Sequence, residues 1–518
     1  MERKLQRLPI GIQEFEKLRT GGYVYVDKTE YIYDLITRGC YYFLSRPRRF
    51  GKSLLMSTIK AYYEGKRELF DGLAIAQKVV EWAAHPVLYL DLNTNQYNEL
   101  DVLKKKLQDS LSQWEQEYDC PSTDLPLGMR FEKVIEAAYR KTGRRVVILV
   151  DEYDKPMLQA IGNKELQDEY RGVLKGFYGA LKSMDGCIQF ALLTGVTKFG
   201  KVSVFSDLNN LKDISMLKRY SSICGITEQE MLDNFSPYID ALSEEYNISR
   251  EECIVKLRRL YDGYHFEVGV EGMYNPFSLL NTFDNCKFDS YWFETGTPSY
   301  LVELLQRHDY NLDSMSHASV TADVLNSVDA ESKDPIPVIY QSGYLTIKGY
   351  DSLFQQYRLG FPNQEVEEGF IRYLTPYYLS KESDRTAFDV RAFYQDVNSG
   401  HPEQFCKRLK SLFADTPYEL VKNLESHYQN IVWVVFKMLG FYTQAEYHTS
   451  EGRIDLVIAT SDYRYVMEFK LDGTAEEALQ QIKSKDYGLP FVMDDKKTFL
   501  IGMNFNSVTR NIEKYIIE

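Results

Sequence analysis

Residues 40–53 read CYYFLSRPRRFGKS, and this segment indicates how the N-terminal half folds. The apolar run CYYFL (40–44) is typical of a strand, and it leads through a basic turn into the helical pattern SLLMSTIKAYYEG. A phosphate site needs backbone N–H groups that converge at a helix N-terminus, with a cation beside them. Gly51, Lys52 and Ser53 stand at this turn. The segment therefore predicts a phosphate-binding loop, in which Lys52 reaches the β- and γ-phosphates of ATP and Ser53 ligates Mg²⁺.

The loop departs from the general pattern G-x-x-x-x-G-K-[ST] at its first position, where this chain has Arg46. Pro47, Arg48 and Arg49 follow, and the sequence therefore predicts a loop that is stiffer and more positive than usual. The alternative interpretation is a basic turn that only caps a helix. In the first interpretation we expect ATP to be bound by consecutive residues of the turn and helix start: Arg48, Arg49, Phe50, Gly51, Lys52, Ser53 and Leu54.

A second motif strengthens the nucleotide interpretation. The apolar run RRVVILVDE (144–152) predicts a buried strand that ends in two carboxylates. We expect Asp151 to hold the Mg²⁺ shell and Glu152 to orient or activate the attacking water. Thr194 ends the next predicted strand, IQFALLTG (188–195), where it could sense the γ-phosphate. The alternatives are two solvent-facing acids and a plain strand-terminating Thr-Gly.

The N-terminal pattern alternates strands with helices, because PVLYLDL (86–92) is another strand and helical patterns fill 98–118 and 130–141. Such alternation predicts an α/β fold with a parallel sheet. After residue 225 the pattern becomes helical, and Thr227 with Glu230 forms a capping box. Residues 335–369 predict two strands and a helix, typical of a small winged-helix module. Residues 380–412 predict a helical linker.

The C-terminal region carries an acidic motif, GRIDLVIATSDYRYVMEFK (452–470). Side chains alternate along a strand, so Glu468 and Lys470 share one face, and Asp455 can lie beside them across a hairpin. Two carboxylates suit Mg²⁺ or Mn²⁺, and Lys470 would position the attacking water. From residue 417 onward the predicted order is αβββαβ: a helix at 418–439, strands at 441–447, 454–459 and 464–470, a helix at 475–488 and a strand at 496–503. Supporting roles are expected for Gln481, Tyr487 and Glu425.

Together these motifs resemble the bacterial AAA-ATPase-like family. The resemblance rests on DKTEYIYDLI, YFLSRPRRFGKSL, VDEYDKP, LLTGVTKF and YDGYHF…YNPFSLL, and it covers nearly the whole chain. RPRRFGKS is that family's own variant of the phosphate loop. The resemblance implies an AAA/STAND-like P-loop ATPase domain at 1–225, a helical lid at 226–310 and a winged-helix-like module at 311–379. A helical linker at 380–415 and a PD-(D/E)xK nuclease-type αβββαβ domain at 416–518 follow.

The composition constrains the partners. The formal net charge of −14 repels nucleic acid in general, so contact with DNA, which we favour over RNA, needs a local basic patch. The seven cysteines show no zinc spacing, which predicts reduced thiols in the cytoplasm. No apolar run is long enough for a membrane span. The sequence is compatible with a homo-oligomer.

Other charged residues are weaker candidates for a catalytic role. His265, His427 and His448 lack paired acids at fixed spacing, so we expect packing roles. Arg219, Arg258 and Arg259 are candidates for an arginine finger, although solvated helix charges are the simpler interpretation. Our leading hypothesis is an ATPase whose nucleotide state controls a metal-dependent nuclease. The alternatives are an ATP-driven nucleic-acid-binding switch without cleavage and a signalling module that binds ATP without useful turnover.

Overall fold

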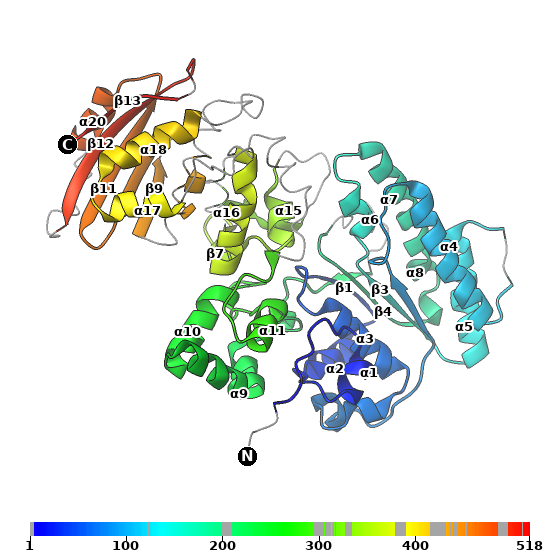
Figure 1. The fold of residues 1–518 in the computed structure, drawn as a ribbon. Helices are drawn as coiled ribbons and strands as arrows, with labels where there is room; N and C mark the ends of the chain where they lie inside the picture. Colours follow the sequence, from blue (N-terminus) through cyan, green and yellow to red (C-terminus); the bar gives the residue numbers. More distant parts are fainter. Residues whose placement is uncertain are drawn as a thin grey trace. The chain divides into compact units, whose positions relative to one another are not determined.

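A computed structural model describes most of the chain (Figure 1). The described residues are 5–121, 124–198, 210–293, 318–326, 334–378, 390–414, 444–450, 453–484, 496–509 and 511–518, with a few isolated positions. The chain divides into two compact units, one of Met1–Gly296 and Ala318–Val366, the other of Thr297–His317 and Glu367–Glu518. No helix among the described residues is long and apolar enough to cross a membrane. The phosphate-loop motif belongs to the first unit and the acidic motif to the second.

The first unit is built on a five-stranded parallel sheet with the order β2-β3-β4-β1-β5. Its strands are β1 (Tyr41–Ser45), β2 (Val87–Asp91), β3 (Val146–Asp151), β4 (Ile188–Gly195) and β5 (Lys212–Asp213). The four strands predicted from the sequence are therefore confirmed. In a parallel sheet the carboxyl ends of all strands lie at one edge, so the loop after β1 and the acids after β3 share that edge.

Helices surround this sheet (Figure 1). They are α1 (Phe15–Thr20), α2 (Thr29–Arg38), α3 (Lys52–Tyr63), α4 (Leu100–Glu117), α5 (Leu127–Thr142), α6 (Lys155–Gln159), α7 (Lys164–Tyr178) and α8 (Ala180–Ser183). Every residue of β3 is buried, as its continuous apolar run requires of a strand covered on both faces. On α4, Leu103, Leu107 and Leu111 recur every four residues and form the buried stripe of the helix.

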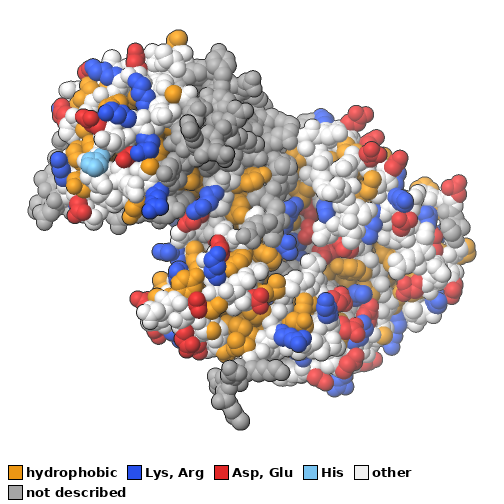
Figure 2. Space-filling view, in the orientation of Figure 1, with side chains coloured by type: hydrophobic (Ala, Val, Ile, Leu, Met, Phe, Trp, Pro, Cys, Tyr) orange, Lys and Arg blue, Asp and Glu red, His pale blue; other side chains and the backbone are white. Residues whose placement is uncertain are grey.

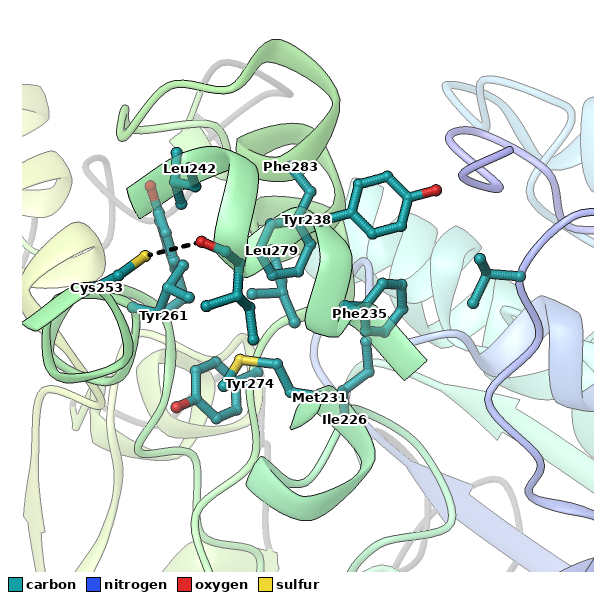
Figure 3. Packing of buried hydrophobic residues seen from close by; sticks show 13 residues of the cluster. Ile226, Met231, Phe235, Tyr238, Leu242, Cys253, Tyr261, Tyr274, Leu279 and Phe283 are labelled. Atoms are coloured by element: carbon teal, nitrogen blue, oxygen red, sulfur yellow. Dashed lines mark hydrogen bonds between the residues drawn. The ribbon is translucent and has the colours of Figure 1, made fainter. Parts of the chain in front are cut away.

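The helical region that the sequence predicts as a lid, called the lid below, follows the sheet and has its own apolar core (Figure 3). Its helices are α9 (Glu228–Tyr246), α10 (Arg250–Tyr261) and α11 (Pro276–Asn285). The predicted capping box at the start of α9 is confirmed, because Thr227 and Glu230 exchange side-chain-to-backbone hydrogen bonds. Val24, from the N-terminal segment, packs into the same core. The N-terminal segment therefore connects the lid to the sheet.

The first unit also contains a small antiparallel sheet with the order β6-β8-β7. Its strands are β6 (Ser319–Thr321), β7 (Thr346–Asp351) and β8 (Gln356–Gly360), with helices α14 (Ala322–Asn326) and α15 (Ile336–Gln341) beside them. Helix α16 (Gln364–Tyr378) follows β8. The two strands and the helix predicted for 335–369 are confirmed.

The second unit is built on a five-stranded sheet with the order β13-β12-β11-β10-β9. The strands are β9 (Gln444–Ser450), β10 (Arg453–Ala459), β11 (Tyr463–Leu471), β12 (Lys497–Asn506) and β13 (Asn511–Ile517), and α20 (Ala475–Ser484) connects β11 to β12. The βββαβ part of the predicted order is confirmed, and β13 adds an edge strand. Helices α17 (Val390–Asn398) and α18 (Pro402–Ala414) lie in the predicted linker, and α18 packs against β13. The boundaries of the five predicted domains stay predictions.

Candidate functional site

The turn between β1 and α3 has the backbone shape of an anion site. Arg49 and Gly51 both have left-handed conformations, with φ values of 69° and 89°. Glycine adopts this conformation without steric cost, whereas strain at a residue such as Arg49 is typical of functional turns. A backbone whose handedness alternates forms a concave set of N–H groups, and here that concavity lies at the N-terminus of α3. The local geometry therefore suits a phosphate group.

Lys52 is the first residue of α3, and its ammonium lies against this turn. The side chain is 4% exposed. Its Nζ donates to the carbonyl oxygens of Arg46 and Pro47 at 3.1 and 3.3 Å, and it lies 3.2 Å from Glu152 Oε1. Glu152 directly follows β3 with a left-handed φ of 53°, which turns the chain away from the strand direction. The structure thus brings together the lysine and the glutamate of the two sequence motifs.

Asp151, Ser53 and Thr194 form a polar cluster beside this pair. Asp151 Oδ1 accepts a hydrogen bond from Thr194 Oγ1 at 2.6 Å, and Ser53 also donates to this carboxylate. Asp151 is buried, and burial together with the negative charge of Glu152 raises its pKa. A buried carboxylate with an acidic neighbour is stabilised by a cation, and hydroxyl and carboxylate oxygens are what Mg²⁺ prefers. These residues therefore fit the Mg²⁺ expected from the sequence.

Arg46 does not add to the positive charge of the loop, whereas Arg48 and Arg49 are exposed there, so the predicted positive loop stays a prediction. Its side chain is 1% exposed and turns into the protein interior. The guanidinium donates to the backbone oxygens of Ser45, Ser215 and Tyr220 at 2.7–2.9 Å and lies 3.9 Å from the centre of the Phe266 ring. Burial lowers the pKa of Arg46 to about 10. Arg46 therefore ties the start of the loop to distant segments and directs its charge away from the phosphate site.

Asp154 is a site residue that the sequence interpretation missed. It is fully buried, and its carboxylate accepts hydrogen bonds from the N–H groups of Val196 and Thr197 and from Thr197 Oγ1. A Cβ at Gly195 would come within 2.5 Å of Asp154 Oδ1, so glycine is needed at the end of β4. Burial raises the pKa of Asp154 to about 6. Asp154 thereby connects the loop after β3 to the chain leaving β4; the motif VDEYD was its sequence signal.

A cavity of about 100 Å³ opens beside the phosphate loop. This volume is several times the ~10–15 Å³ that one water molecule needs. Its walls come from the N-terminal segment, the loop with α3, and the lid, and they include Val26, Lys28, Phe50, Gly51, Leu54, Thr58, Cys224 and Leu280. Phe50 and Leu54 therefore face this cavity. Arg48 is exposed, and the Arg49 guanidinium lies 4.6 Å from the centre of the Phe277 ring in α11.

In the second unit, β11 places Glu468 and Lys470 on one face of the sheet. Lys470 Nζ lies 3.0 Å from Glu468 Oε1 and also donates to Gln481 Oε1 on α20. Glu468 is completely buried, and its Oε2 accepts no hydrogen bond in the part of the chain that the structure describes. An unpartnered buried carboxylate oxygen is costly unless a cation binds it. Glu468 therefore fits the predicted divalent metal.

The strand register places Asp455 of β10 directly opposite Glu468 of β11. Directly opposite residues of an antiparallel pair share one face, so the register agrees with the predicted pairing of these two acids. The side chain of Asp455, and Glu425 and Tyr487 as a whole, lie outside the described residues. Among the side chains that are described, no group of three or more His, Cys, Asp or Glu residues is arranged to hold a metal.

The remaining candidates have structural partners or lie outside this part of the chain. Arg258 pairs with Glu228 at 2.7 Å, and Arg219 Nη1 lies 3.5 Å from Asp34 Oδ2. These arginines are helix surface charges in this structure. His265 is half-buried, and burial lowers its pKa. The side chains of His427 and His448 lie outside the described residues.

Comparisons with known proteins agree with this two-site arrangement. A family model described as a predicted AAA-ATPase matches residues 9–205, and one described as the PD-(D/E)XK nuclease superfamily matches residues 423–515. A curated protein of Azotobacter chroococcum mcd 1 is 35% identical over 529 residues, covering 100% of this chain and 99% of that protein. It is described as an uncharacterized protein in the vnfD 5′ region.

Proposed function

Because the chain belongs to the predicted AAA-ATPase family and carries a domain of the PD-(D/E)XK nuclease superfamily, we propose that it hydrolyses ATP and cleaves nucleic acid under control of the bound nucleotide. One observation carries the ATPase proposal. Lys52, at the N-terminus of α3, lies 3.2 Å from Glu152 Oε1, beside the buried cluster of Asp151 and Thr194. This arrangement places a cation, a candidate base, and hydroxyl and carboxylate oxygens around one turn whose backbone suits a phosphate group.

Each residue of this cluster has a role in phosphoryl transfer. The backbone at Gly51 cradles the phosphates, and Lys52 exchanges its carbonyl partners for β- and γ-phosphate oxygens. Ser53 and Asp151 hold Mg²⁺, which neutralises charge on the phosphates when bound. Glu152 orients the attacking water and accepts its proton, and Thr194 senses the γ-phosphate from the end of β4. Asp154 positions the chain after β4, and with it Thr194.

The cavity beside the loop accommodates the base of the nucleotide. It begins at Gly51 and Leu54, where the phosphates of a bound nucleotide end, and its walls are mainly apolar. Lid residues such as Leu280 and N-terminal residues such as Val26 both line it. A bound base therefore contacts the sheet domain and the lid at once, which couples nucleotide binding to the position of the lid.

The C-terminal site supports metal-dependent phosphodiester cleavage. Asp455 and Glu468 would hold Mg²⁺ or Mn²⁺, which lowers the pKa of a bound water and polarises the phosphate. Lys470 positions the attacking water, and Gln481 fixes the ammonium of Lys470. Glu425 and Tyr487 support the site in this proposal. The substrate is nucleic acid, with DNA favoured over RNA.

The proposed setting is the bacterial cytoplasm. All seven cysteines are free thiols, which suits a reducing compartment. Acidic and basic side chains are interspersed over the face of the first unit that Figure 2 shows. With a net charge of −14, a local basic patch must provide the nucleic-acid contact. A homo-oligomer is compatible with the proposal.

The ATPase proposal is tested with the variant Lys52→Ala. We expect ATP hydrolysis to be abolished and ATP affinity to fall strongly, because Lys52 supplies the charge that faces the phosphates. Lys60→Ala is a matched control on the same helix, since Lys60 pairs with the surface residue Glu64. Phosphate release and nucleotide affinity are measured in both variants. Undiminished hydrolysis in Lys52→Ala would exclude this site.

Nuclease activity is tested with the same purified chain. Single- and double-stranded DNA and RNA are incubated with Mg²⁺ or Mn²⁺, with and without ATP, and the products are separated by size. Cleavage that requires the metal and disappears in Glu468→Ala supports the proposal. ATP hydrolysis without cleavage of any substrate would favour the alternative of a nucleotide-driven switch.

A further inference from the structure

Phosphoryl transfer generally needs a cation beyond the loop lysine, because charge spreads over the γ-phosphate oxygens in the transition state. Two of the three arginines considered for this role from the sequence pair with surface acids, Arg258 with Glu228 and Arg219 with Asp34, and Arg259 is exposed on α10. Arg46 is buried behind the loop. Lys155 lies at the edge of the sheet where β3 ends, and its charge interacts with those of Glu152, Arg48 and Asp91.

Lys155 is placed at this edge by the turn after β3. It is the first residue of α6, and its backbone N–H donates to the carbonyl oxygen of Glu152 at 3.1 Å. Its Nζ reaches across to the loop after β2, where it donates to the backbone oxygen of Asn93 and to Asn93 Oδ1 at 2.8 Å. Lys155 therefore lies between the ends of β2 and β3, on the far side of Glu152 from β4.

The ammonium of Lys155 has neutral hydrogen-bond partners. Both acceptors are amide oxygens of Asn93, and the side chain is about half-buried. Burial lowers the pKa of Lys155, and the positive charge of Arg48 lowers it further, while the negative charges of Glu152 and Asp91 oppose this shift. A partly desolvated cation beside another cation is stabilised by an anion. A phosphate group at the end of β3 is such an anion.

We propose that Lys155 is a further catalytic residue, which leaves Asn93 as the transition state forms and there donates hydrogen bonds to the γ-phosphate oxygens. This inference rests on the proposed ATPase function. Water attacks the γ-phosphorus, the bond from that phosphorus to the β–γ bridging oxygen breaks, and the proton of the water passes to Glu152. Lys155 remains protonated throughout and neutralises the charge that develops on the γ-phosphate oxygens. The cation is supplied by the same chain, so turnover needs no residue from a second copy.

The variants Lys155→Met and Asn93→Ala separate a catalytic lysine from a structural one. We expect Lys155→Met to lower kcat roughly 10²–10³-fold, the usual effect of removing one group that stabilises developing negative charge. ATP affinity should change by less than about threefold, because the additional contact forms mainly in the transition state. Asn93→Ala removes only the resting partner of Lys155, so its kcat should stay within about threefold of the wild type.

Trapping of ADP with aluminium fluoride provides a second measurement that a structural role would not affect. Lys155→Met should lose this transition-state complex while it still binds ATP and ADP, and Lys155→Arg should recover part of the trapping. Wild-type turnover per chain should be independent of protein concentration. If Lys155→Met and Asn93→Ala lose the same activity, or if trapping in Lys155→Met matches the wild type, the inference is overturned while the ATPase proposal stands. A wild-type chain without ATP hydrolysis overturns both.

Discussion

Glu152 lies 3.2 Å from Lys52 although the two residues belong to separate motifs. They meet because β1 and β3 are parallel and end at the same edge of the sheet, separated by β4. The left-handed turn at Glu152 completes the approach. A resting ion pair of this kind holds the proposed base next to the lysine proposed to bind the phosphates, and in that proposal ATP displaces the ion pair.

Glu152→Gln should therefore keep ATP bound but stall hydrolysis. The amide fills the same space, yet it cannot accept the proton of the attacking water, and general-base catalysis typically contributes roughly 10²–10⁴-fold. ATP affinity should stay the same or rise slightly, because removal of the carboxylate frees Lys52 from its ion pair. Nucleotide affinity and single-turnover hydrolysis are measured side by side. Normal turnover in this variant would remove Glu152 from the catalytic role.

The local residues of both sites could be predicted because their motifs are short and continuous. Lys52 and Ser53 are adjacent, Asp151 and Glu152 are adjacent, and Glu468 and Lys470 are two positions apart on one strand. Arg46 and Asp154 were not predictable in the same way. Partners of Arg46 lie 169 and 174 positions away, and partners of Asp154 lie 42 and 43 positions away. No local sequence pattern indicates that the side chain of an arginine in a basic turn is buried in the protein interior.

Among the elements, the sequence predicted the central strands of both five-stranded sheets but missed the edge strands β5 and β13. The run NIEKYII (511–517) buries only Ile512 and has Glu513 and Lys514 exposed in its middle. An edge strand of this kind lacks the regular alternation that marks a half-buried strand. It is recognised only through its pairing with β12, which is a contact of the folded chain.

Helix α20 packs unusually close to β12 at Gly502. In β12, Gly502 is the register partner of Glu468. A Cβ there would lie 2.4 Å from the backbone oxygen of Ala475 and 2.6 Å from the backbone nitrogen of Leu479. Both atoms belong to the backbone of α20, so the helix itself would have to move. The absence of a side chain at 502 thus brings α20 close enough for Gln481 to reach Lys470.

Gly502→Ala should displace α20 and disturb the C-terminal site. We expect a loss of about 1–3 kcal/mol in the free energy of unfolding of this unit, the usual cost of overpacking, together with reduced metal-dependent cleavage. ATP hydrolysis should be unaffected. Thr498→Ala, an exposed position on the same strand, is the control. Chemical denaturation and cleavage assays measure both effects; wild-type cleavage and stability in Gly502→Ala would contradict the packing argument.

Glu365 connects α16 to the lid and makes the free energy of unfolding depend on pH. Its Oε1 accepts hydrogen bonds from the N–H groups of Tyr291 and Trp292 at 2.6 and 2.9 Å, and its Oε2 has no partner among the described residues. Burial raises the pKa of Glu365 from 4.5 to about 7. The folded chain therefore holds a proton that the unfolded chain releases between these two values, so stability falls as pH rises from 4.5 through 7.

Glu365→Gln should remove this dependence. The amide oxygen keeps both hydrogen bonds to the backbone without a charge, so the variant should gain stability relative to the wild type as pH rises toward 7.5. The gain is of the order of 3 kcal/mol above pH 7 and vanishes below pH 4.5. Denaturant unfolding at pH 4.5 and 8 measures it, with Glu271→Gln as an exposed control. An equal difference from wild type at both pH values would contradict a buried, titrating Glu365.

For the whole molecule, the covalent path between the two sites constrains how they communicate. The chain passes between the two compact units three times, after Gly296, after His317 and after Val366. The last passage lies within α16, which begins at Gln364 in the first unit and ends at Tyr378 in the second. Glu365 anchors the start of this helix beside Trp292, whose Nε1 donates to the backbone oxygen of Arg48 in the phosphate loop at 3.4 Å. A change in the conformation of the phosphate loop can therefore be transmitted to α16 through Trp292 and Glu365.

We accordingly expect the nucleotide state to change cleavage by the C-terminal site. ATP shifts the balance between a cleaving and a blocked form only if it binds them with different affinity; a coupling of roughly 1–3 kcal/mol changes cleavage about 5- to 150-fold. Glu468→Ala should eliminate cleavage and leave ATP hydrolysis nearly intact, whereas Lys52→Ala should change both activities. Glu152→Gln with ATP should hold the chain in its ATP form. Cleavage is measured for each full-length variant in the apo, ATP and ADP states. Equal rates in all three states would refute gating even if both sites are active, because a ligand without differential affinity cannot move the equilibrium.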